Sequence, residues 1–179
     1  MDAKLADAAR RHAAHTRRRV RGEAAAYDRT SRVPLPGYAG SLLAYATAVA
    51  STAAAARRTG HRLPDRFDLA DVALGGLATH KFTRLLSKGS VTSPLRAPFT
   101  ELEEPAGSAE LNESARGGTL RHTVGELVTC PFCLGQWVGS AYVAGLVVAP
   151  RQARTWAAVF AVTAVSDAMQ QVYARLRED

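Results

Sequence analysis

The sequence predicts an all-α protein: a small polytopic helical membrane bundle of about four spans with a basic N-terminal arm. Two observations carry this prediction. Residues 33–56 and 127–150 are two runs of 24 residues without Asp, Glu, Lys, Arg or His, and a helix needs about 20 mostly apolar residues to cross the hydrocarbon core of a bilayer. The basic side chains gather elsewhere, with nine of the 23 in residues 1–32.

The composition excludes two other classes of protein. With 47% hydrophobic and 22% charged residues, the chain is too apolar for an intrinsically disordered protein. Two cysteines are too few for a disulfide-rich secreted scaffold. The mean hydropathy of −0.10 averages charged segments with apolar ones, so it does not exclude a membrane protein.

Residues 1–32 are predicted to form a basic cytoplasmic arm. They carry nine basic and four acidic side chains, a charge of +5 out of the chain's +7, and are most basic at Arg17-Arg18-Arg19 and Arg21. No apolar stretch follows closely enough for a secretory signal peptide. A solvated arm that fixes the topology is the favoured interpretation. The alternatives are attraction to anionic lipid head groups and nonspecific contact with nucleic acid.

Residues 33–179 are predicted to form a helical membrane domain. Its spans are expected at about 35–56, 67–82, 134–149 and 155–173, with a cytoplasmic loop over 83–133. The alternative is a soluble all-α protein in which these helices are buried. A soluble bundle helix normally has a polar face, whereas 41–56 and 138–149 contain no charged residue. Membrane insertion is therefore favoured.

The distribution of basic residues predicts the topology. With the N-terminus inside, 17 basic residues fall on the inner side of the four spans and six on the outer side, as the positive-inside rule requires. The expected location is the bacterial cytoplasmic membrane, multi-pass, with both termini cytoplasmic. Within the cytoplasmic loop, the polar and turn-rich residues 101–118 are expected to be mobile.

Ionisable residues in or near the expected spans need partners, because charges are costly in lipid. Asp167 can pair with Lys81 or with Arg84. The other interpretation places Asp71 and Asp167 near span ends, where their carboxylates reach the interface.

The sharpest local motif is Cys130-Pro131-Phe132-Cys133. Two thiols three positions apart face the same side of a helix or turn, so they can form a redox pair or half of a zinc or iron site. A zinc site needs four ligands, which His122, His80 or a second subunit would have to complete. The other interpretation is that the pair has a packing or turn role. No catalytic residue is assigned, and the sequence favours a noncatalytic protein while leaving an enzyme open.

Three segments resemble a known bacterial family. Residues 85–100, 116–118 and 125–137 are similar to motifs of the domain-of-unknown-function family thirteen-sixty, whose members are small multi-span membrane proteins with a Cys-Pro-Phe-Cys-Leu-Gly-x-Trp motif. The resemblance covers about residues 65–175. It implies a multi-span membrane protein and supplies no activity.

A candidate site is expected where the basic loop and the cysteine pair converge on the cytoplasmic side. Lys88 and Arg96 are suited to phosphate or lipid head groups, and Glu126 completes the set for a partner or a lipid. Cys130 and Cys133 are the candidate metal ligands.

Three partner classes follow from these features. Membrane lipid is expected, the Gly135-x-x-x-Gly139 spacing allows a homo-oligomer, and nucleic acid is not favoured. The competing functions are a membrane-bound thiol-redox or metal-dependent enzyme, and a soluble helical protein that binds nucleic acid through its arm.

Overall fold

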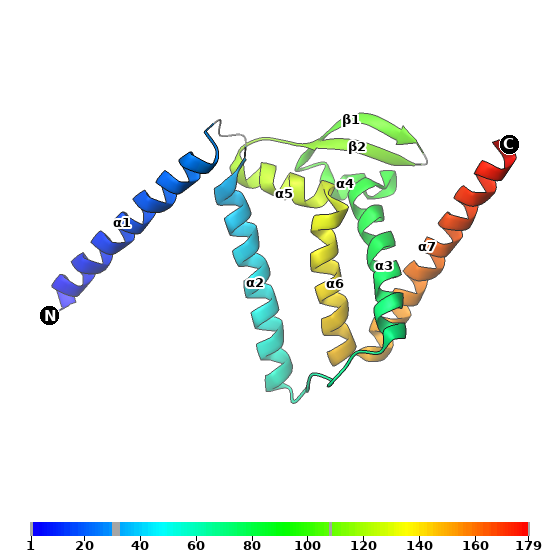
Figure 1. The fold of residues 1–179 in the computed structure, drawn as a ribbon, viewed down its shortest axis with the longest axis horizontal. Coiled ribbons are helices and arrows are strands. Elements are labelled where there is room, and N and C mark those ends of the chain that lie inside the picture. Colours follow the sequence, from blue (N-terminus) through cyan, green and yellow to red (C-terminus); the bar gives the residue numbers. More distant parts are fainter. Residues whose placement is uncertain (1, 30–32, 108, 179) are drawn as a thin grey trace.

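A computed structural model describes residues 2–29, 33–107 and 109–178. Most of these residues are helical (Figure 1). The long helices are α1 (Asp2–Tyr27), α2 (Leu35–Arg58), α3 (Leu69–Lys88), α6 (Pro131–Val148) and α7 (Pro150–Glu178). Shorter elements between α3 and α6 are the 3₁₀ turn η1 (Ser90–Thr92), α4 (Ser93–Arg96), β1 (Thr100–Gly107), β2 (Glu110–Ala115) and α5 (Thr119–Thr129). The arm's residues 30–32 lie outside the described residues, and α1 covers most of the rest of the arm.

Four helices run alternately down and up, in the order α2, α3, α6 and α7 (Figure 1). Each expected span falls largely within one of them. Because four helices alternate in direction, α2 begins and α7 ends on the same side of the bundle. This is also the side of the hairpin. The connection between α2 and α3 and the turn between α6 and α7 lie at the other end.

The core lies where α3, α6 and α7 meet. Ala78, Tyr142 and Ala157 are buried there, and five partly buried apolar residues pack against them: Leu74, Leu146, Ala153, Trp156 and Phe160. The Tyr142 ring lies directly against Gly75, where a Cβ would overlap it. Its hydroxyl donates a hydrogen bond to the Asp71 carbonyl at 3.0 Å. Small residues on α3 thus allow close approach of α6.

α2 stands apart from this core. All of its residues are described and none of them is buried. It contacts α5 and α6, and its first turn lies against α5, where a Cβ at Gly37 would overlap the Thr123 side chain. Further along, the Tyr45 hydroxyl lies 2.7 Å from Ser140 Oγ and accepts a hydrogen bond from Gln136 Nε2 at 2.7 Å. The contacts of Gly37 and Tyr45 therefore hold the first half of α2 against α5 and α6.

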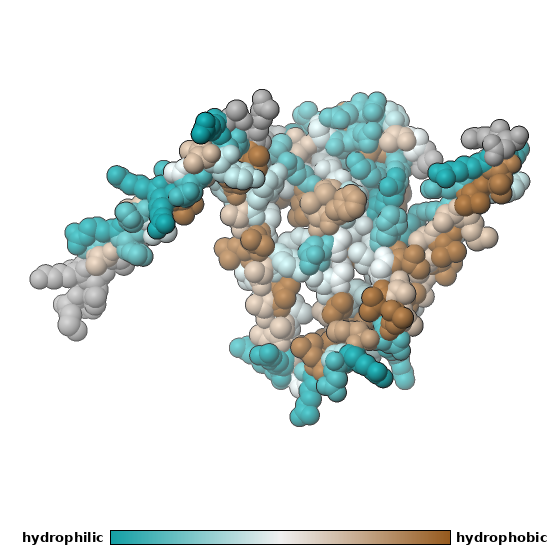
Figure 2. Space-filling view, viewed as in Figure 1, coloured by the Kyte–Doolittle hydropathy of each residue, from teal (hydrophilic) through white to brown (hydrophobic). Residues whose placement is uncertain are grey.

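Two described helices are long and apolar enough to cross a membrane. They are α2, with 24 residues, and α6, with 18. Only 0% and 6% of their most apolar stretches are buried. In Figure 2 brown and pale residues form the middle of the bundle, between teal ends.

The segment 101–118 corrects two expectations. The sequence predicts a mobile loop in an all-α chain, whereas most of this segment forms the antiparallel hairpin β1–β2, a two-stranded sheet. The Glu-rich sequence has no clear apolar alternation, so nothing local predicts a strand. Arginines outside the hairpin hold it: Arg84 donates to Glu110 at 2.7 and 2.8 Å, and Arg96 donates to Glu113 at 2.5 Å.

Candidate functional site

The polar end of the bundle carries all five expected site residues. We call this end the cap; it comprises η1, α4, β1, β2, α5 and the last turn of α3 and the first turn of α6. Lys88 and Arg96 lie on its α3–α4 side, and Glu126, Cys130 and Cys133 on its α5–α6 side. α5 connects the two sides, since it packs on β2, α3, α4 and α6.

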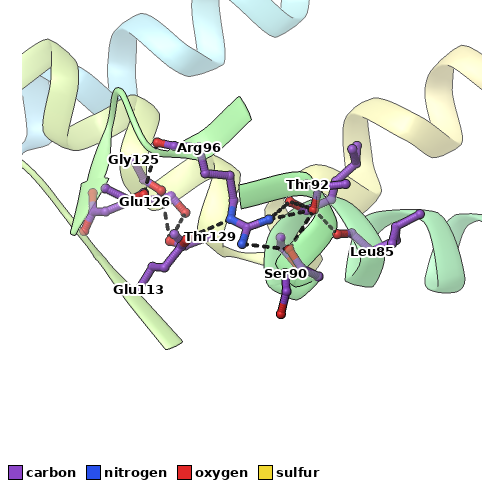
Figure 3. A network of polar contacts seen from close by, with 12 residues as sticks. Leu85, Ser90, Thr92, Arg96, Glu113, Gly125, Glu126 and Thr129 are labelled. Carbon is purple, nitrogen blue, oxygen red and sulfur yellow. Dashed lines mark hydrogen bonds and ion pairs between the residues drawn. The ribbon is translucent and has the colours of Figure 1, made fainter. Parts of the chain in front are cut away.

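Arg96 lies inside the cap rather than on its surface. The residue is 1% exposed, and its guanidinium donates to four acceptors (Figure 3). They are Glu113 Oε2, the carbonyls of Leu86 and Gly89, and Thr92 Oγ1. Carbonyls at the end of a helix lack partners within the helix, and Arg96 supplies one at the end of α3. Through these four acceptors Arg96 holds the end of α3, η1 and β2 together within the cap.

The backbone and the charge of Arg96 are also paired. Its carbonyl accepts a hydrogen bond from Thr100 Oγ1 at 3.0 Å, which ties the end of α4 to the start of β1. The Glu113 side chain is 5% exposed, so the Arg96–Glu113 pair is a buried ion pair. A buried charge needs such a partner, because burial removes its hydration.

Lys88, the last residue of α3, differs from its basic neighbours. It is half-buried and makes no ion pair or side-chain hydrogen bond with the residues that the structure describes. Arg84, one turn earlier, is held by both oxygens of Glu110. Of the basic residues expected in this loop site, Lys88 therefore has the amino group that remains available for an anionic group.

Glu126 joins α5 to α2. Its Oε1 accepts a hydrogen bond from the Tyr38 hydroxyl at 3.0 Å and lies 3.5 Å from His122 Nε2. Its Oε2 is buried without a hydrogen-bond partner among the described residues. Tyr38 is absent from the expected site residues, because a tyrosine early in an apolar helix gives no signal for a contact 88 positions away.

The cysteine pair begins α6. Cys130 is the N-cap residue, and its Sγ accepts a hydrogen bond from the backbone N–H of Cys133 at 3.3 Å. Pro131 fits the first turn because it lacks the N–H that would be unpaired there. Both thiols are free, and Phe132 between them is 90% exposed. In this structure the Cys130 sulfur thus caps α6, and Cys133 takes part through its backbone N–H.

The expected metal ligands do not assemble into a complete site. Among the described residues, no three His, Cys, Asp or Glu side chains are grouped so that they could hold a metal ion. His122 and His80 therefore do not join Cys130 and Cys133 in such a group. A structural zinc site has four protein ligands, so the cysteine pair by itself does not fit one.

Two ion pairs join α3 to α7 along the bundle. Asp71 accepts hydrogen bonds from Arg154 Nε and Nη2 at 2.8 and 2.7 Å. Lys81 donates to Asp167. Of the two partners considered for Asp167, the structure shows Lys81. α3 thus pairs its charges with those of a helix more than 80 residues later in the chain.

An apolar groove of about 770 Å³ lies between α2, α3 and α6. Gly135 and Gly139 line it, so the Gly-x-x-x-Gly face of α6 points toward the space beside α2. The Tyr45, Gln136 and Ser140 contacts also lie in its wall. The small residues of these helices are visible in the sequence, but their common groove depends on how the helices are arranged.

The comparisons with known proteins give one family. A profile described as "Protein of unknown function (DUF1360)" matches residues 74–173, which run from α3 through the cap to α7. The matched segment includes Cys130, Cys133 and the whole hairpin. No curated protein and no solved structure matches the chain.

Proposed function

The chain belongs to the DUF1360 family, and we propose that it is a noncatalytic, four-span protein of the bacterial cytoplasmic membrane whose cap binds a partner protein in the cytoplasm. The proposed spans are the four long helices after the arm, at about 35–56, 67–82, 134–149 and 155–173. Both termini and the cap then lie on the cytoplasmic side.

The observation that carries the membrane placement is what α3 buries. Its buried residues are all small or polar: Asp71, Gly75, Ala78, Thr83 and Ser87. Three of its large apolar side chains face outward, with Leu69 81%, Val72 57% and Leu77 46% exposed, while Leu74 and Phe82 pack partly against α6 and α7. A helix of a water-soluble protein buries its apolar stripe. Helices in lipid pack through small residues and turn polar ones inward, which is the pattern of α3.

The lengths and charges of the helices support four spans. At about 1.5 Å per residue, the 29 residues of α7 extend about 44 Å, more than a hydrocarbon core of about 30 Å. At the same rise per residue, the 20 residues of α3 extend about 30 Å, a length that includes the last turn in the cap. The ionisable residues of α3 and α7 are the reason why they are less apolar than α2 and α6. Asp71 pairs with Arg154 and Lys81 with Asp167, so these charges have partners on the neighbouring helix.

The cap presents apolar side chains outside the proposed spans. Val91 is 79% exposed, Leu95 67%, Leu120 78% and Phe132 90%. Exposed apolar residues that form one contiguous patch mark protein-binding sites, and we propose that these residues contribute to such a patch. Lys88 adds a basic group on the same end of the bundle, and Arg96 and Glu126 hold the elements that present these residues. The cap therefore offers a rigid surface for a cytoplasmic partner.

Membrane placement is tested by fractionation together with thiol labelling. We expect the full chain to stay in the membrane pellet after washes with high salt and with alkaline carbonate, and to enter solution with detergent. Cys130 and Cys133 are its only cysteines, so a membrane-impermeant maleimide should label the chain in inside-out vesicles and not in intact spheroplasts. Asp65→Cys in a Cys130→Ser/Cys133→Ser background should show the reverse labelling.

Two results would contradict this placement. Release of the chain by salt alone would show a soluble or peripheral protein. Labelling of the two native cysteines and of the thiol introduced by Asp65→Cys from the same side would show that no membrane separates the cap from the α2–α3 connection.

Partner binding is tested by a photo-crosslinking amino acid placed at Leu95 or Phe132 in living cells. A discrete crosslinked product of the same mass from both positions is expected, because both lie on the cap. Asp65 at the other end of the bundle is the control position. Products that are equally strong at Asp65, or none at the cap positions, would contradict a cytoplasmic partner.

A further inference from the structure

The apolar groove has room that the chain's own side chains leave open. Three helices and the α2–α3 connection line it, and most of its lining is apolar. Gly76 on α3 and Gly139 on α6 both face it, and a Cβ at either position would meet nothing within 4 Å. Its volume of about 770 Å³ lies within the range of about 300–1,000 Å³ that small-molecule sites occupy.

The groove differs at its two ends. Toward the cap, Tyr45, Gln136 and Ser140 are hydrogen-bonded to one another, and Trp137 packs edge-on against Tyr45 at 5.2 Å between ring centres. These contacts join α2 to α6. Toward the other end, Leu63 and Phe67 of the connection line the groove, and no described ion pair or side-chain hydrogen bond ties the arginines beside them to the bundle.

Those arginines give the open end a net positive charge, since residues 57–68 carry four arginines against Asp65 and Asp68. Arg57 directly follows the groove-lining Ala56, Arg62 precedes Leu63, and Arg66 precedes Phe67. With Arg58 they are four exposed arginines, and none pairs with a residue that the structure describes. In the proposed topology they lie on the outer side, against the usual bias of basic residues to the inside. A ligand that carries negative charge accounts for their position.

We propose that the groove holds an acyl chain of an anionic phospholipid whose phosphate lies among Arg57, Arg58, Arg62 and Arg66. The inference rests on the proposed membrane placement and adds a specific lipid site to it. The apolar lining suits a hydrocarbon chain, and guanidinium groups bind phosphate through paired hydrogen bonds. An anionic phospholipid therefore matches both the apolar lining of the groove and the positive charge at its open end.

The test uses the full chain purified in detergent and mixed with equal amounts of phosphatidylglycerol and phosphatidylcholine. Native mass spectrometry should show one phosphatidylglycerol retained at least several-fold more than phosphatidylcholine. Gly76→Leu/Gly139→Leu fills the groove and should lower retention of both lipids about tenfold. Arg62→Gln/Arg66→Gln should remove the preference for phosphatidylglycerol and leave some retention of both.

Matched controls separate the groove from general effects on the protein. Ala168→Leu adds bulk to an exposed position of α7 outside the groove. Arg151→Gln removes a charge at the same end of the bundle, from a residue that does not line or border the groove. Both controls should retain phosphatidylglycerol like the unchanged chain.

A second measurement does not depend on bulky substitutions. Trp137 lines the groove, whereas Trp156 packs against the core of α3, α6 and α7. In a Trp156→Phe variant, phosphatidylglycerol with brominated acyl chains should quench the remaining Trp137 fluorescence and saturate near one lipid per chain. Brominated phosphatidylcholine at the same concentration should quench it several-fold less.

Several outcomes would overturn the inference while membrane placement stands. These are equal retention of the two lipids by the unchanged chain, unchanged retention in Gly76→Leu/Gly139→Leu, and a dimer that excludes lipid. Fractionation of the same variants keeps the two proposals apart. A chain that pellets with membranes but shows no preference for phosphatidylglycerol loses only the lipid site.

Discussion

α2 and α3 are neighbours in the chain and similar in length, yet they differ in how many of their residues are buried. α3 contacts α6, α7 and the cap, and it buries five small or polar residues. α2 buries none of its residues, although it is one of the two most apolar helices described. In water the more apolar helix would be expected to be the more buried. Polarity and close packing, rather than apolar surface, therefore determine which of the two lies at the centre.

The strongest loss of stability is expected at the end of α3. Arg96→Met should lower the free energy of unfolding of the cap by about 3–5 kcal/mol, because Glu113 is left buried and unpaired and carbonyls at the end of α3 lose their donor. Hydrogen exchange of the hairpin in detergent measures this change. Arg84→Gln, which breaks a more exposed pair, is the control and should cost at most about 1 kcal/mol. Equal effects of the two variants would contradict a central role for Arg96.

Two adjacent glycines test how α3 packs. Gly75→Ala places a Cβ into the Tyr142 ring and is expected to cost about 1–3 kcal/mol by overpacking. Gly76→Ala meets open space and should change stability by no more than about 1 kcal/mol, with a gain from helix propensity. Denaturant unfolding followed by circular dichroism in detergent compares them. A larger loss at Gly76 would show that α3 packs through another face.

A weaker response is expected where α2 touches α5. Gly37→Ala overlaps the Thr123 side chain, and we expect a loss of about 1 kcal/mol, at the low end for overpacking because α2 is free to shift. Thr123→Ala removes the overlapped oxygen, so the double variant should recover part of this loss in a double-mutant cycle. Additive losses, measured by the same unfolding, would argue against direct contact of these two residues.

The smallest loss of stability is expected where Tyr38, in the first turn of α2, contacts Glu126 of α5. Tyr38→Phe removes the hydrogen bond to Glu126, and we expect a loss of about 0.5 kcal/mol, the low end for a hydrogen bond, since Tyr38 is 41% exposed. Limited proteolysis at the junction of α1 and α2 should become slightly faster. A loss as large as that of Gly75→Ala would mean that α2 is held as firmly as α3.

The sequence predicts the positions of the helices better than the contacts between elements that lie far apart in the chain. Charge-free runs locate α2 and α6 well because lipid-crossing length and apolarity are local properties. The family resemblance is confirmed over residues 74–173. The hairpin escapes prediction because it depends on Arg84 and Arg96, which bind glutamates 26 and 17 positions later. The sequence around Arg96 suggests an exposed basic residue that could bind a ligand. Its burial is not evident from the sequence, because its ion-pair partner Glu113 lies 17 positions later.

The groove and the Tyr38–Glu126 contact escape prediction for a related reason. Each is formed by residues of helices that meet only in the fold, and Gly135 and Gly139 give a spacing without saying what faces it. The roles of Lys88, Arg96, Glu126 and the cysteine pair in binding stay predictions. Cys130 also has a structural role, since its sulfur caps the N-terminus of α6.

The pairing of α3 with α7 also constrains the order of biosynthesis. Lys81 and Asp71 leave the ribosome 86 and 83 residues before Asp167 and Arg154. In the proposed membrane, α3 would therefore carry two uncompensated charges until α7 follows, at the cost that lipid imposes on such groups. Its stable residence in the bilayer then depends on the last helix of the chain, so truncation before residue 150 should leave α3 a substrate for membrane quality control.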